Sequence, residues 1–478
     1  MKKLLITLTV LLAATTGIYA QNFRTGYFLD GYMYKYQLNP AFQGERGFIA
    51  LPVIGGTSIG IESNLTGSAF FYPQADGSLS LFADPEIPTS TVLSNFNKMN
   101  LVNENLDLNL LAIGFRAKNT YHTLDFSLRE NISTAIPVDV FRFVKEGSSL
   151  SENSYDFSSW SASVNAYLQA AYGFSIKIKD IASIGFRAKF LMGVQSAYAN
   201  LTDFRISYGQ NKYSVNAAGD IIASSMILNN ALAEKEIDSM QELMTSAINN
   251  PSCGAAIDLG FSVDFLKHFT VSGAILDLGF ISWKNSMQVK YGPSSWELDI
   301  NEIQNSVGSN PTQEDIERVE NELNSSLDDL SSLFNIENPK TLDKYVHKLG
   351  FTTLLGLEFR LPFYDRISIG ALGTHRFEGT NSWTEGRVSL NYAPSRWFSL
   401  TGNYAISTYG ESYGAAVNIH PKGLNIFLGV DSFKPLLNMT PQFIPMEELN
   451  TNVKFGVTFP FGKYNGRYPK KEKVEKNS

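Results

Sequence analysis

Residues 184–190 read Ile184-Gly185-Phe186-Arg187-Ala188-Lys189-Phe190, so apolar side chains take the even positions and glycine or basic side chains take the odd ones. Successive side chains of a β-strand point to opposite faces of its sheet, and this spacing predicts a strand with one apolar face. The same alternation recurs over residues 123–129, 349–360 and 453–459. The chain is therefore expected to be an all-β protein.

The second face of these strands is unlike the water-facing side of a soluble sandwich, which would be richer in Lys, Glu and Thr. Over residues 349–360 it carries Gly350, Thr352, Leu354, Gly356, Glu358 and Arg360. Glycine and small residues with scattered charges suit the crowded or wet interior of a barrel whose apolar face meets lipid. The 22 Tyr and 33 Phe fit aromatic girdles at the two membrane interfaces.

No stretch of the sequence is apolar for the roughly 18 consecutive residues that indicate a spanning helix. A closed barrel is the other structure that satisfies every backbone polar group in lipid. We therefore expect a monomeric, transmembrane antiparallel β-barrel of about 14–16 strands, with boundaries uncertain by a few residues.

Composition narrows the function classes. Of the 478 residues 18% are charged, below the roughly 25% of an average soluble chain. The formal charge of −7 argues against nucleic acid as the main partner. The one cysteine, Cys253, excludes an intramolecular disulfide.

The first twenty residues resemble a secretory signal peptide. Met1-Lys2-Lys3 is the positive region, an apolar run follows to Ala14, and Ile18-Tyr19-Ala20 suits the cleavage site, so Gln21 should begin the mature protein. The apolar run is too short for a spanning helix. No cysteine directly follows the signal, so a lipid anchor is not expected. The predicted location is the outer membrane.

Loop lengths provide an independent argument for a barrel. Tight turns are predicted at 119–120, 179–183, 266–268, 362–365, 393–395 and 420–423. Much longer connections are predicted at 132–159, 209–252, 282–348 and 431–450. Strict alternation of short and long connections is expected, as in barrels with short periplasmic turns and long outer loops.

Two of the long loops have helical periodicity. Asn310-Pro311 predicts a cap followed by proline at the first helical position, before apolar residues spaced by three and four from Ile316 to Phe334. Apolar residues between about 227 and 248 predict a second helix. Such helices could form a lid or a partner-docking surface, or could simply pack against the barrel rim.

These patterns divide the chain into four predicted segments: a signal peptide at 1–20, a plug-like segment at 21–46, the barrel at 47–462 and a charged periplasmic tail at 463–478. A turn is predicted at Asn39-Pro40-Ala41-Phe42, because the residue before proline avoids the helical region. This turn lies in the second segment. This turn could seat the segment inside the barrel, or could merely lead the chain into the first strand.

Three short motifs carry a family resemblance: Phe28-Leu29-Asp30-Gly31-Tyr32, Tyr36-Gln37-Leu38-Asn39-Pro40-Ala41-Phe42 and residues 274–283. Together they resemble a Bacteroidetes family of outer-membrane proteins of unassigned function. The Leu-Asn-Pro-Ala-Phe element is also similar to one in accessory barrels of the type IX secretion system. More distantly, the layout is similar to long-chain fatty-acid channels, which implies an N-terminal plug inside a barrel. The resemblance implies architecture and compartment, and brings no catalytic motif.

The sequence offers no pattern for catalysis, cofactor binding or metal binding. The histidines, at 122, 268, 347, 375 and 420, show no metal-ligand spacing. No nucleophile elbow, P-loop or H-E-x-x-H motif is present. His375 is the nearest catalytic candidate, yet it shares parity with Ile367, Ile369 and Ala371, which are expected to face lipid. We therefore expect that the protein is not an enzyme and that it binds no cofactor and no metal.

Charged residues on the small-residue face of the strands are the predicted site. They are Arg116, Asp125, Arg129, Arg187, Lys189, Glu358 and Arg360. They could guide a solute or seat the plug, or they could form cross-strand salt bridges that only stabilise a closed lumen, because a buried charge must be paired.

Two functions follow. The long loops favour a partner-binding or secretion-accessory barrel that contacts a periplasmic or surface protein. The alternative is a channel or transporter for hydrophobic solutes such as long-chain fatty acids. That alternative predicts an apolar pocket in the lumen and a kinked strand, whereas the accessory barrel predicts a sealed lumen.

Overall fold

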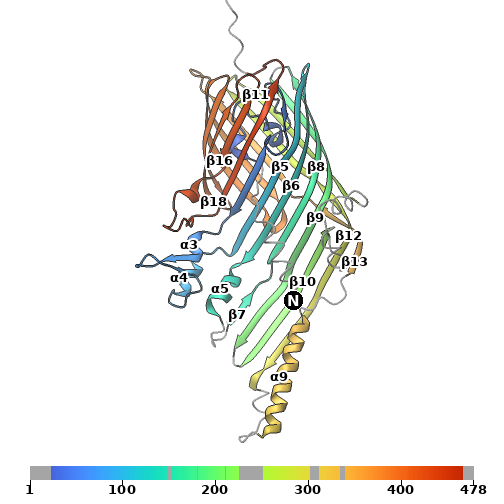
Figure 1. The fold of residues 1–478 in the computed structure, drawn as a ribbon, viewed down its shortest axis with the longest axis vertical. Helices are drawn as coiled ribbons and strands as arrows, with labels where there is room; N and C mark the ends of the chain where they lie inside the picture. The colour runs from blue at the N-terminus through green and yellow to red at the C-terminus, as the bar shows by residue number, and fades with distance from the viewer. Residues whose placement is uncertain are drawn as a thin grey trace, which may run out of the picture.

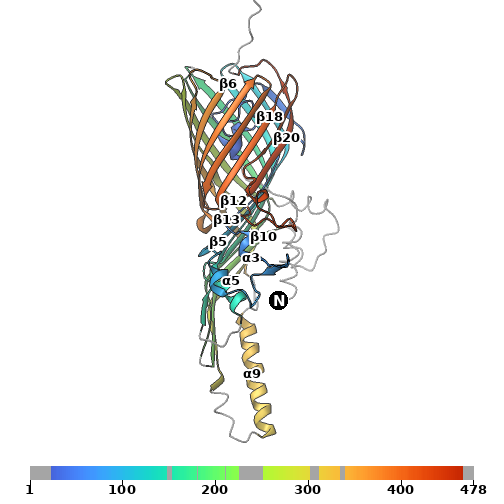
Figure 2. The same ribbon diagram turned by 90° about the vertical axis from the view of Figure 1, so that its left-hand side faces the viewer.

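The computed structural model describes residues 23–147, 153–179, 181–209, 211–225, 251–301, 312–333 and 340–466. It is a closed antiparallel barrel whose strands tilt around a filled interior (Figures 1 and 2). The strands are β1 (Gly47–Ala50), β2 (Thr57–Ser63), β3 (Phe71–Pro73), β4 (Leu79–Leu81), β5 (Met99–Ala117), β6 (Thr120–Pro137), β7 (Asn153–Asp156), β8 (Ser161–Ile178), β9 (Ala182–Gly209), β10 (Lys212–Ser225), β11 (Ser252–Phe265), β12 (Phe269–Asp299), β13 (Lys340–Lys348), β14 (Phe351–Arg360), β15 (Ile367–Phe377), β16 (Trp383–Ser395), β17 (Phe398–Ser407), β18 (Gly410–Ile419), β19 (Asn425–Val430) and β20 (Thr451–Phe461).

The helices are short, with one exception. They are η1 (Arg24–Gly26), α2 (Lys35–Leu38), α3 (Gly67–Phe70), α4 (Thr89–Leu93), α5 (Val138–Glu146), α9 (Gln313–Leu333), η2 (Gly379–Asn381) and η3 (Lys434–Leu436). No helix among the described residues is both long and apolar enough to cross a membrane.

The first and last strands close the barrel. Both β1 and β2 pair with β20 on one side and with β5 on the other, so together they occupy one place in the wall. From there the pairings run through β5, β6, β8, β9, β11, β12 and β14 to β20, which gives fourteen strand positions in the described ring. This count lies at the lower end of the predicted range and confirms the predicted fold class.

Side-chain burial follows the predicted alternation. On β9 the side chains of Ile184, Phe186 and Phe190 are 50%, 40% and 56% exposed on the outer face, whereas Arg187 and Lys189 are 1% and 4% exposed inside. An apolar outer face is what a barrel wall in contact with lipid needs, because lipid offers no water to solvate polar side chains. The strand-parity prediction is therefore correct for the segment from which it was drawn.

The prediction that short and long connections alternate strictly was wrong. Short turns do join strands at one end, at the top of Figure 1. At the other end, however, short connections join β15 to β16 and β17 to β18, through residues 378–382 and 408–409. Long loops are therefore confined to part of the rim opposite the short turns.

Much of what was predicted as long loop is strand. β9 and β12 continue beyond the barrel and pair there with β7, β10 and β13, which builds a sheet that projects from one side of the rim (Figure 1). Within the predicted loops 209–252 and 282–348, residues 212–225, 282–299 and 340–348 belong to β10, β12 and β13. Strands that extend past lipid lose the alternation on which the prediction depended.

The predicted helix after residue 310 is present as α9, which runs alongside the end of β12 and away from the barrel (Figures 1 and 2). Its N-terminus is capped by Thr312: Asp315 N donates to Thr312 Oγ1 at 3.2 Å, and Thr312 N donates to Asp315 Oδ2 at 3.0 Å. This reciprocal pair is a capping box. Asn310, Pro311, Phe334 and the predicted helix at 227–248 lie outside the described residues.

Candidate functional site

Residues 23–42, here called the plug, lie inside the barrel (Figure 2). Its aromatic rings are buried, with Phe23, Tyr27 and Tyr34 each 1% exposed. Tyr34 meets Phe48 of β1 and Phe427 of β19 edge to face, with ring centroids 5.8 and 5.6 Å apart. Edge-to-face contacts of this kind add to the stabilisation that area burial provides. The plug is thus packed into the wall on several sides.

The turn Asn39-Pro40-Ala41-Phe42 lies against the inner face of β9, β11 and β12. Ala41 N donates to Asn39 Oδ1 at 2.9 Å, which fixes the turn. Asn39 Nδ2 donates to the carbonyls of Phe261 and Gly273 at 3.0 and 3.2 Å, which ties the turn to the wall.

Two glycines make room for this turn. A Cβ atom at Gly185 would lie 2.1 Å from the Pro40 carbonyl, and one at Gly260 would lie 2.1 Å from Asn39 Oδ1. Neither close approach is possible for a residue with a side chain. The wall is therefore shaped to this turn.

A buried ion cluster holds the first residues of the plug. Arg24 pairs with Glu62 of β2, and its Nε donates to Glu385 of β16 at 3.0 Å. The amides of Arg24 and Thr25 donate to the Asp431 carboxylate at 3.1 and 2.7 Å. Arg387 also pairs with Glu385, at 2.9 Å. These residues, none of them predicted, form the Arg24 cluster: Arg24, Glu62, Glu385, Arg387 and Asp431.

A second buried cluster includes three of the predicted residues. Arg187 pairs with Asp125 and Asp258, both at 2.8 Å, and Lys189 pairs with Asp258 at 2.6 Å and with Asp277. The Arg187 guanidinium also lies over the ring of Tyr36 in the plug, 5.2 Å from its centroid. We call these residues the Arg187 cluster: Asp125, Arg187, Lys189, Asp258 and Asp277.

The remaining predicted residues lie at three places. Arg129 pairs with Asp107 at 3.2 Å and reaches Asp277 at 3.9 Å, which joins it to the Arg187 cluster. Glu358 and Arg360 pair with each other at 3.1 Å. Arg116 instead donates to Gln43 Oε1 at 2.6 Å and to the Gly44 carbonyl at 3.1 Å, just after the plug.

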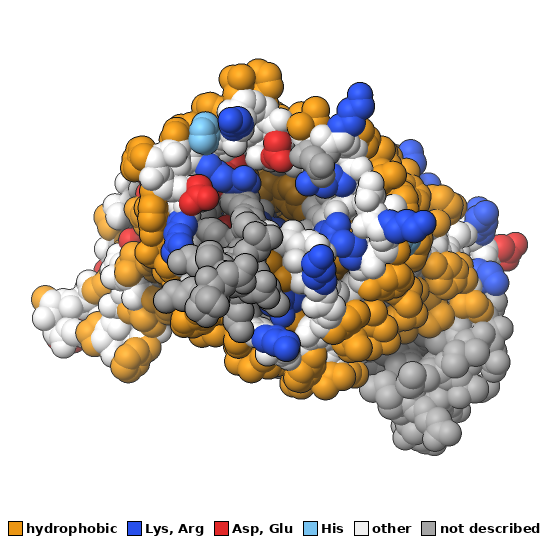
Figure 3. Space-filling view, turned by 90° about the horizontal axis from the view of Figure 1, so that it is seen from above, with side chains coloured by type: hydrophobic (Ala, Val, Ile, Leu, Met, Phe, Trp, Pro, Cys, Tyr) orange, Lys and Arg blue, Asp and Glu red, His pale blue; other side chains and the backbone are white. Residues whose placement is uncertain are grey.

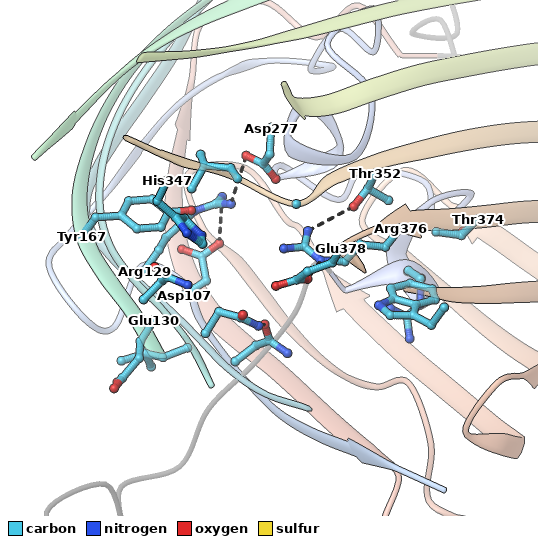
Figure 4. A pocket seen from close by; sticks show the side chains of 18 of the residues that line it. Asp107, Arg129, Glu130, Tyr167, Asp277, His347, Thr352, Thr374, Arg376 and Glu378 are labelled. Carbon is cyan, nitrogen blue, oxygen red and sulfur yellow. Dashed lines mark hydrogen bonds and ion pairs between the residues drawn. The ribbon is translucent and has the colours of Figure 1, made fainter. Parts of the chain in front are cut away.

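A cavity of about 70 Å³ lies between the two clusters (Figure 4). Its lining includes Arg24 of the first cluster, Asp277 of the second and Arg129. Figure 4 shows Arg376, paired with Glu378, pointing toward it from the opposite wall. Its lining is mainly polar, whereas the channel alternative predicted an apolar pocket. The volume suits a few water molecules or a very small solute.

Several polar atoms of residues that line this cavity have no hydrogen-bond partner within the described part of the chain. They are Asn105 Nδ2, Arg129 Nε, Thr374 Oγ1 and Trp383 Nε1. Buried polar groups are normally paired, so an occupant with acceptor oxygens, such as water, would satisfy them. The Arg24 guanidinium also lies over the Trp383 indole, 4.7 Å from the ring centroid.

The histidines stay apart from one another. His375 has its Nδ1 2.7 Å from Thr384 Oγ1, and His347 lines the cavity. His420, in the turn after β18, lies against Gly31 of the plug, where a Cβ would be 2.4 Å from the imidazole ring; the lack of a side chain at Gly31, with its φ of +69°, permits the contact. Burial lowers the pKa of His420 to about 4. Within the described residues no group of His, Cys, Asp and Glu side chains could hold a metal ion.

A family model matches residues 40–431, which is most of the chain. The chain belongs to the family of unknown function DUF5723. No curated protein matches its sequence. The predicted likeness to Bacteroidetes proteins and to type IX secretion barrels stays a prediction.

Solved structures similar to this DUF5723 protein include three barrels. The Pseudomonas putida toluene transporter TodX is 7% identical, with a TM-score of 0.40, over 91% of this chain and 94% of that one. The Ralstonia pickettii toluene transporter TbuX is 9% identical, with a TM-score of 0.42, over 94% and 96%. A Pseudomonas aeruginosa FadL homologue is 9% identical, with a TM-score of 0.39, over 93% and 100%.

Proposed function

We propose that this DUF5723 protein is an outer-membrane channel for small hydrophobic solutes, closed at rest by the plug of residues 23–42. Residues 1–20 would direct export and be removed. The observation that carries the proposal is the character of the wall at the level of the plug. Phe48, Leu276, Leu354, Leu372 and Phe427 face inward and are buried in one cluster with the plug aromatics.

An apolar inner face of this kind differs from the polar interior of a water-filled barrel. Displacement of the plug would open a path lined by these apolar side chains. A hydrated ion gains nothing there, whereas a hydrophobic solute regains part of the apolar burial that the plug loses, at about 25 cal/mol per Å². The solute that best compensates plug movement is therefore hydrophobic.

The buried ion clusters fit the role of holding the plug in place. Arg24 and the backbone of Thr25 tie one end to β2, β16 and the segment after β19, and Arg187 lies over Tyr36 further along. Buried ion pairs add little net stability because desolvation offsets their attraction. They set the position of the plug, because a displaced plug would take Arg24 away from the buried Glu62 and Glu385 carboxylates.

Two of the similar structures, TodX and TbuX, are named as toluene transporters, and toluene is a small hydrophobic molecule. Their TM-scores lie below 0.5, so the proposal depends on the geometry of this chain alone. Partner binding remains a second candidate. It is favoured by the projecting sheet of β9, β10, β12 and β13 and by the exposed Ile316 and Leu327 of α9.

Native mass spectrometry of the protein, extracted gently from its own outer membrane, distinguishes the two candidates. The channel proposal expects a retained hydrophobic small molecule and no protein partner at equal stoichiometry. The Arg24→Ala variant serves as a comparison, because a loosened plug should change the amount retained. A stoichiometric protein partner without any small molecule would overturn the channel proposal in favour of partner binding.

A further inference from the structure

The end of the barrel that carries the short turns has a hollow centre (Figure 3). The hollow, here called the vestibule, has a volume of about 940 Å³, and its lining includes Ala41 and Phe42 at the end of the plug and Gln43 just after it. It is far larger than the cavity of about 70 Å³ beside Arg24. By analogy with other outer-membrane barrels, short turns face the periplasm.

Basic residues recur in the short connections at this end. One or more lies in each turn between paired strands, and one follows β20: Lys118, Lys179, Lys267, Arg366, Arg396, Lys422 and Lys463. Figure 3 shows Lys and Arg side chains around the opening. The chain as a whole carries a formal charge of −7, so positive charge is concentrated here against the overall balance.

The vestibule lining itself is strongly basic. Among the described residues it contains eight Lys and Arg and one carboxylate, Asp264, which accepts a hydrogen bond from Thr270. No ion pair between described residues joins Lys118, Lys179 or Lys422 to a carboxylate. Two of the arginines, Arg46 and Arg396, lie over the Tyr464 ring at 5.4 and 5.6 Å. Within the described part of the chain, Lys118, Lys179 and Lys422 thus have no carboxylate partner and can meet an external one.

We infer that the vestibule binds an acidic, extended segment of a periplasmic protein. The cations come from hairpins spaced around the barrel, so one small anion cannot reach them all, whereas a chain with several carboxylates can engage many at once. Lipid headgroups surround the outside of the wall, and the basic residues that line this hollow are inside it. Electrostatic complementarity of this kind raises association rates and selects partners.

The occupant of the vestibule would touch the plug. Arg116, in the lining, donates to Gln43 Oε1 and to the Gly44 carbonyl, and Phe42 packs against the plug core. An acidic segment that drew Arg116 away would remove these two hydrogen bonds at the end of the plug. The inference goes beyond the proposed function and does not depend on which solute passes.

The test measures binding of fluorescein-labelled decaglutamate to the full mature protein in detergent, by fluorescence anisotropy at low salt. The charge-reversed variant K118E/K179E/K422E should bind at least about tenfold more weakly than the wild type. The matched control K290E/K340E/K344E reverses three exposed lysines on β12 and β13, beyond the opposite rim, and should stay within about twofold.

Three results would overturn the inference. They are equal binding by the vestibule variant, competition by acetate at the same carboxylate concentration, and competition by phosphatidylglycerol added to the detergent micelles. Heat-dependent gel mobility verifies that each variant is folded. Should the vestibule variant fail to fold, the salt dependence of the wild type tests the inference. Binding of decaglutamate to the wild type must weaken steeply with added salt, and binding that is independent of salt would overturn the inference. Uptake of hydrophobic solutes is measured in a separate assay, so failure of the proposed channel function and failure of this binding inference can be told apart.

Discussion

The Arg187 guanidinium donates two hydrogen bonds to the Asp125 carboxylate, at 3.0 and 2.8 Å, although β8 lies between their strands. Gly173 of β8 stands between them, and a Cβ there would lie 2.9 Å from Arg187 Cγ. The side chain therefore crosses a neighbouring strand through the space that a glycine leaves. This contact joins β6 to β9 across β8, and the same guanidinium lies over the ring of Tyr36 in the plug.

Arg187→Ala is expected to destabilise the barrel by about 3–5 kcal/mol, because it leaves the Asp125 and Asp258 carboxylates buried without their guanidinium. The urea midpoint of refolding in detergent micelles measures this. Combining Arg187→Met with Asp125→Asn should restore most of the loss, because Asp258 keeps Lys189. If the double variant is as unstable as the single one, unpaired charge is not the cause.

Arg24→Ala should loosen the plug, because Arg24 alone joins it to both Glu62 and Glu385 by ion pairs. Single-channel recording in planar bilayers should show more frequent openings than in the wild type. Arg142→Ala is the control, since Arg142 also forms two ion pairs, with Asp139 and Glu146 on α5, although these are more exposed and do not involve the plug. Identical traces for all three proteins would count against the Arg24 cluster as a tether.

Gly260→Val should displace the Asn39-Pro40 turn, because its Cβ would meet Asn39 Oδ1 at 2.1 Å and Pro40 Cδ at 2.9 Å. We expect higher ion conductance with little change in β-sheet content. Gly402→Val on β17 is the matched control, because a Cβ there meets nothing within 4 Å. The interpretation fails if both variants conduct alike.

His420 predicts an acid sensitivity of the plug contact. Burial, which outweighs the effect of Asp30, lowers its folded pKa to about 4, below the unfolded value of about 6.5. Its stabilising contribution is therefore present above about pH 6.5 and is lost as pH falls through about 4. Unfolding midpoints across this range should fall less steeply for His420→Gln than for the wild type. Parallel curves would exclude a role for this histidine.

Strand parity was enough to predict which residues face inward where the wall is regular. Arg187 and Lys189 followed from their apolar neighbours, and the same argument would have found Asp258 between Ile257 and Leu259. It could not have found Asp277. A bulge opposite Asp258, with Asp277 at a φ of 62°, turns both Leu276 and Asp277 inward and breaks the period.

The Arg24 cluster was out of reach of the sequence for a different reason. Arg24 lies in a segment with no strand or helix period, and its partners Glu385 and Asp431 follow it by more than 360 residues. Only closure of the barrel brings them together. The asymmetric outer rim was missed similarly, because the extensions of β9 and β12 lack the apolar face that marks a strand in lipid.

The most direct test of the central claim is uptake of radiolabelled toluene and radiolabelled oleate by cells that contain the wild-type barrel, the Arg24→Ala variant or no barrel. A plugged hydrophobic channel predicts faster uptake of at least one probe with the wild type than without the barrel, a rate altered by Arg24→Ala, and no change for a hydrophilic sugar. Uptake of both probes at the barrel-free rate, with folded protein present in the outer membrane, would contradict it.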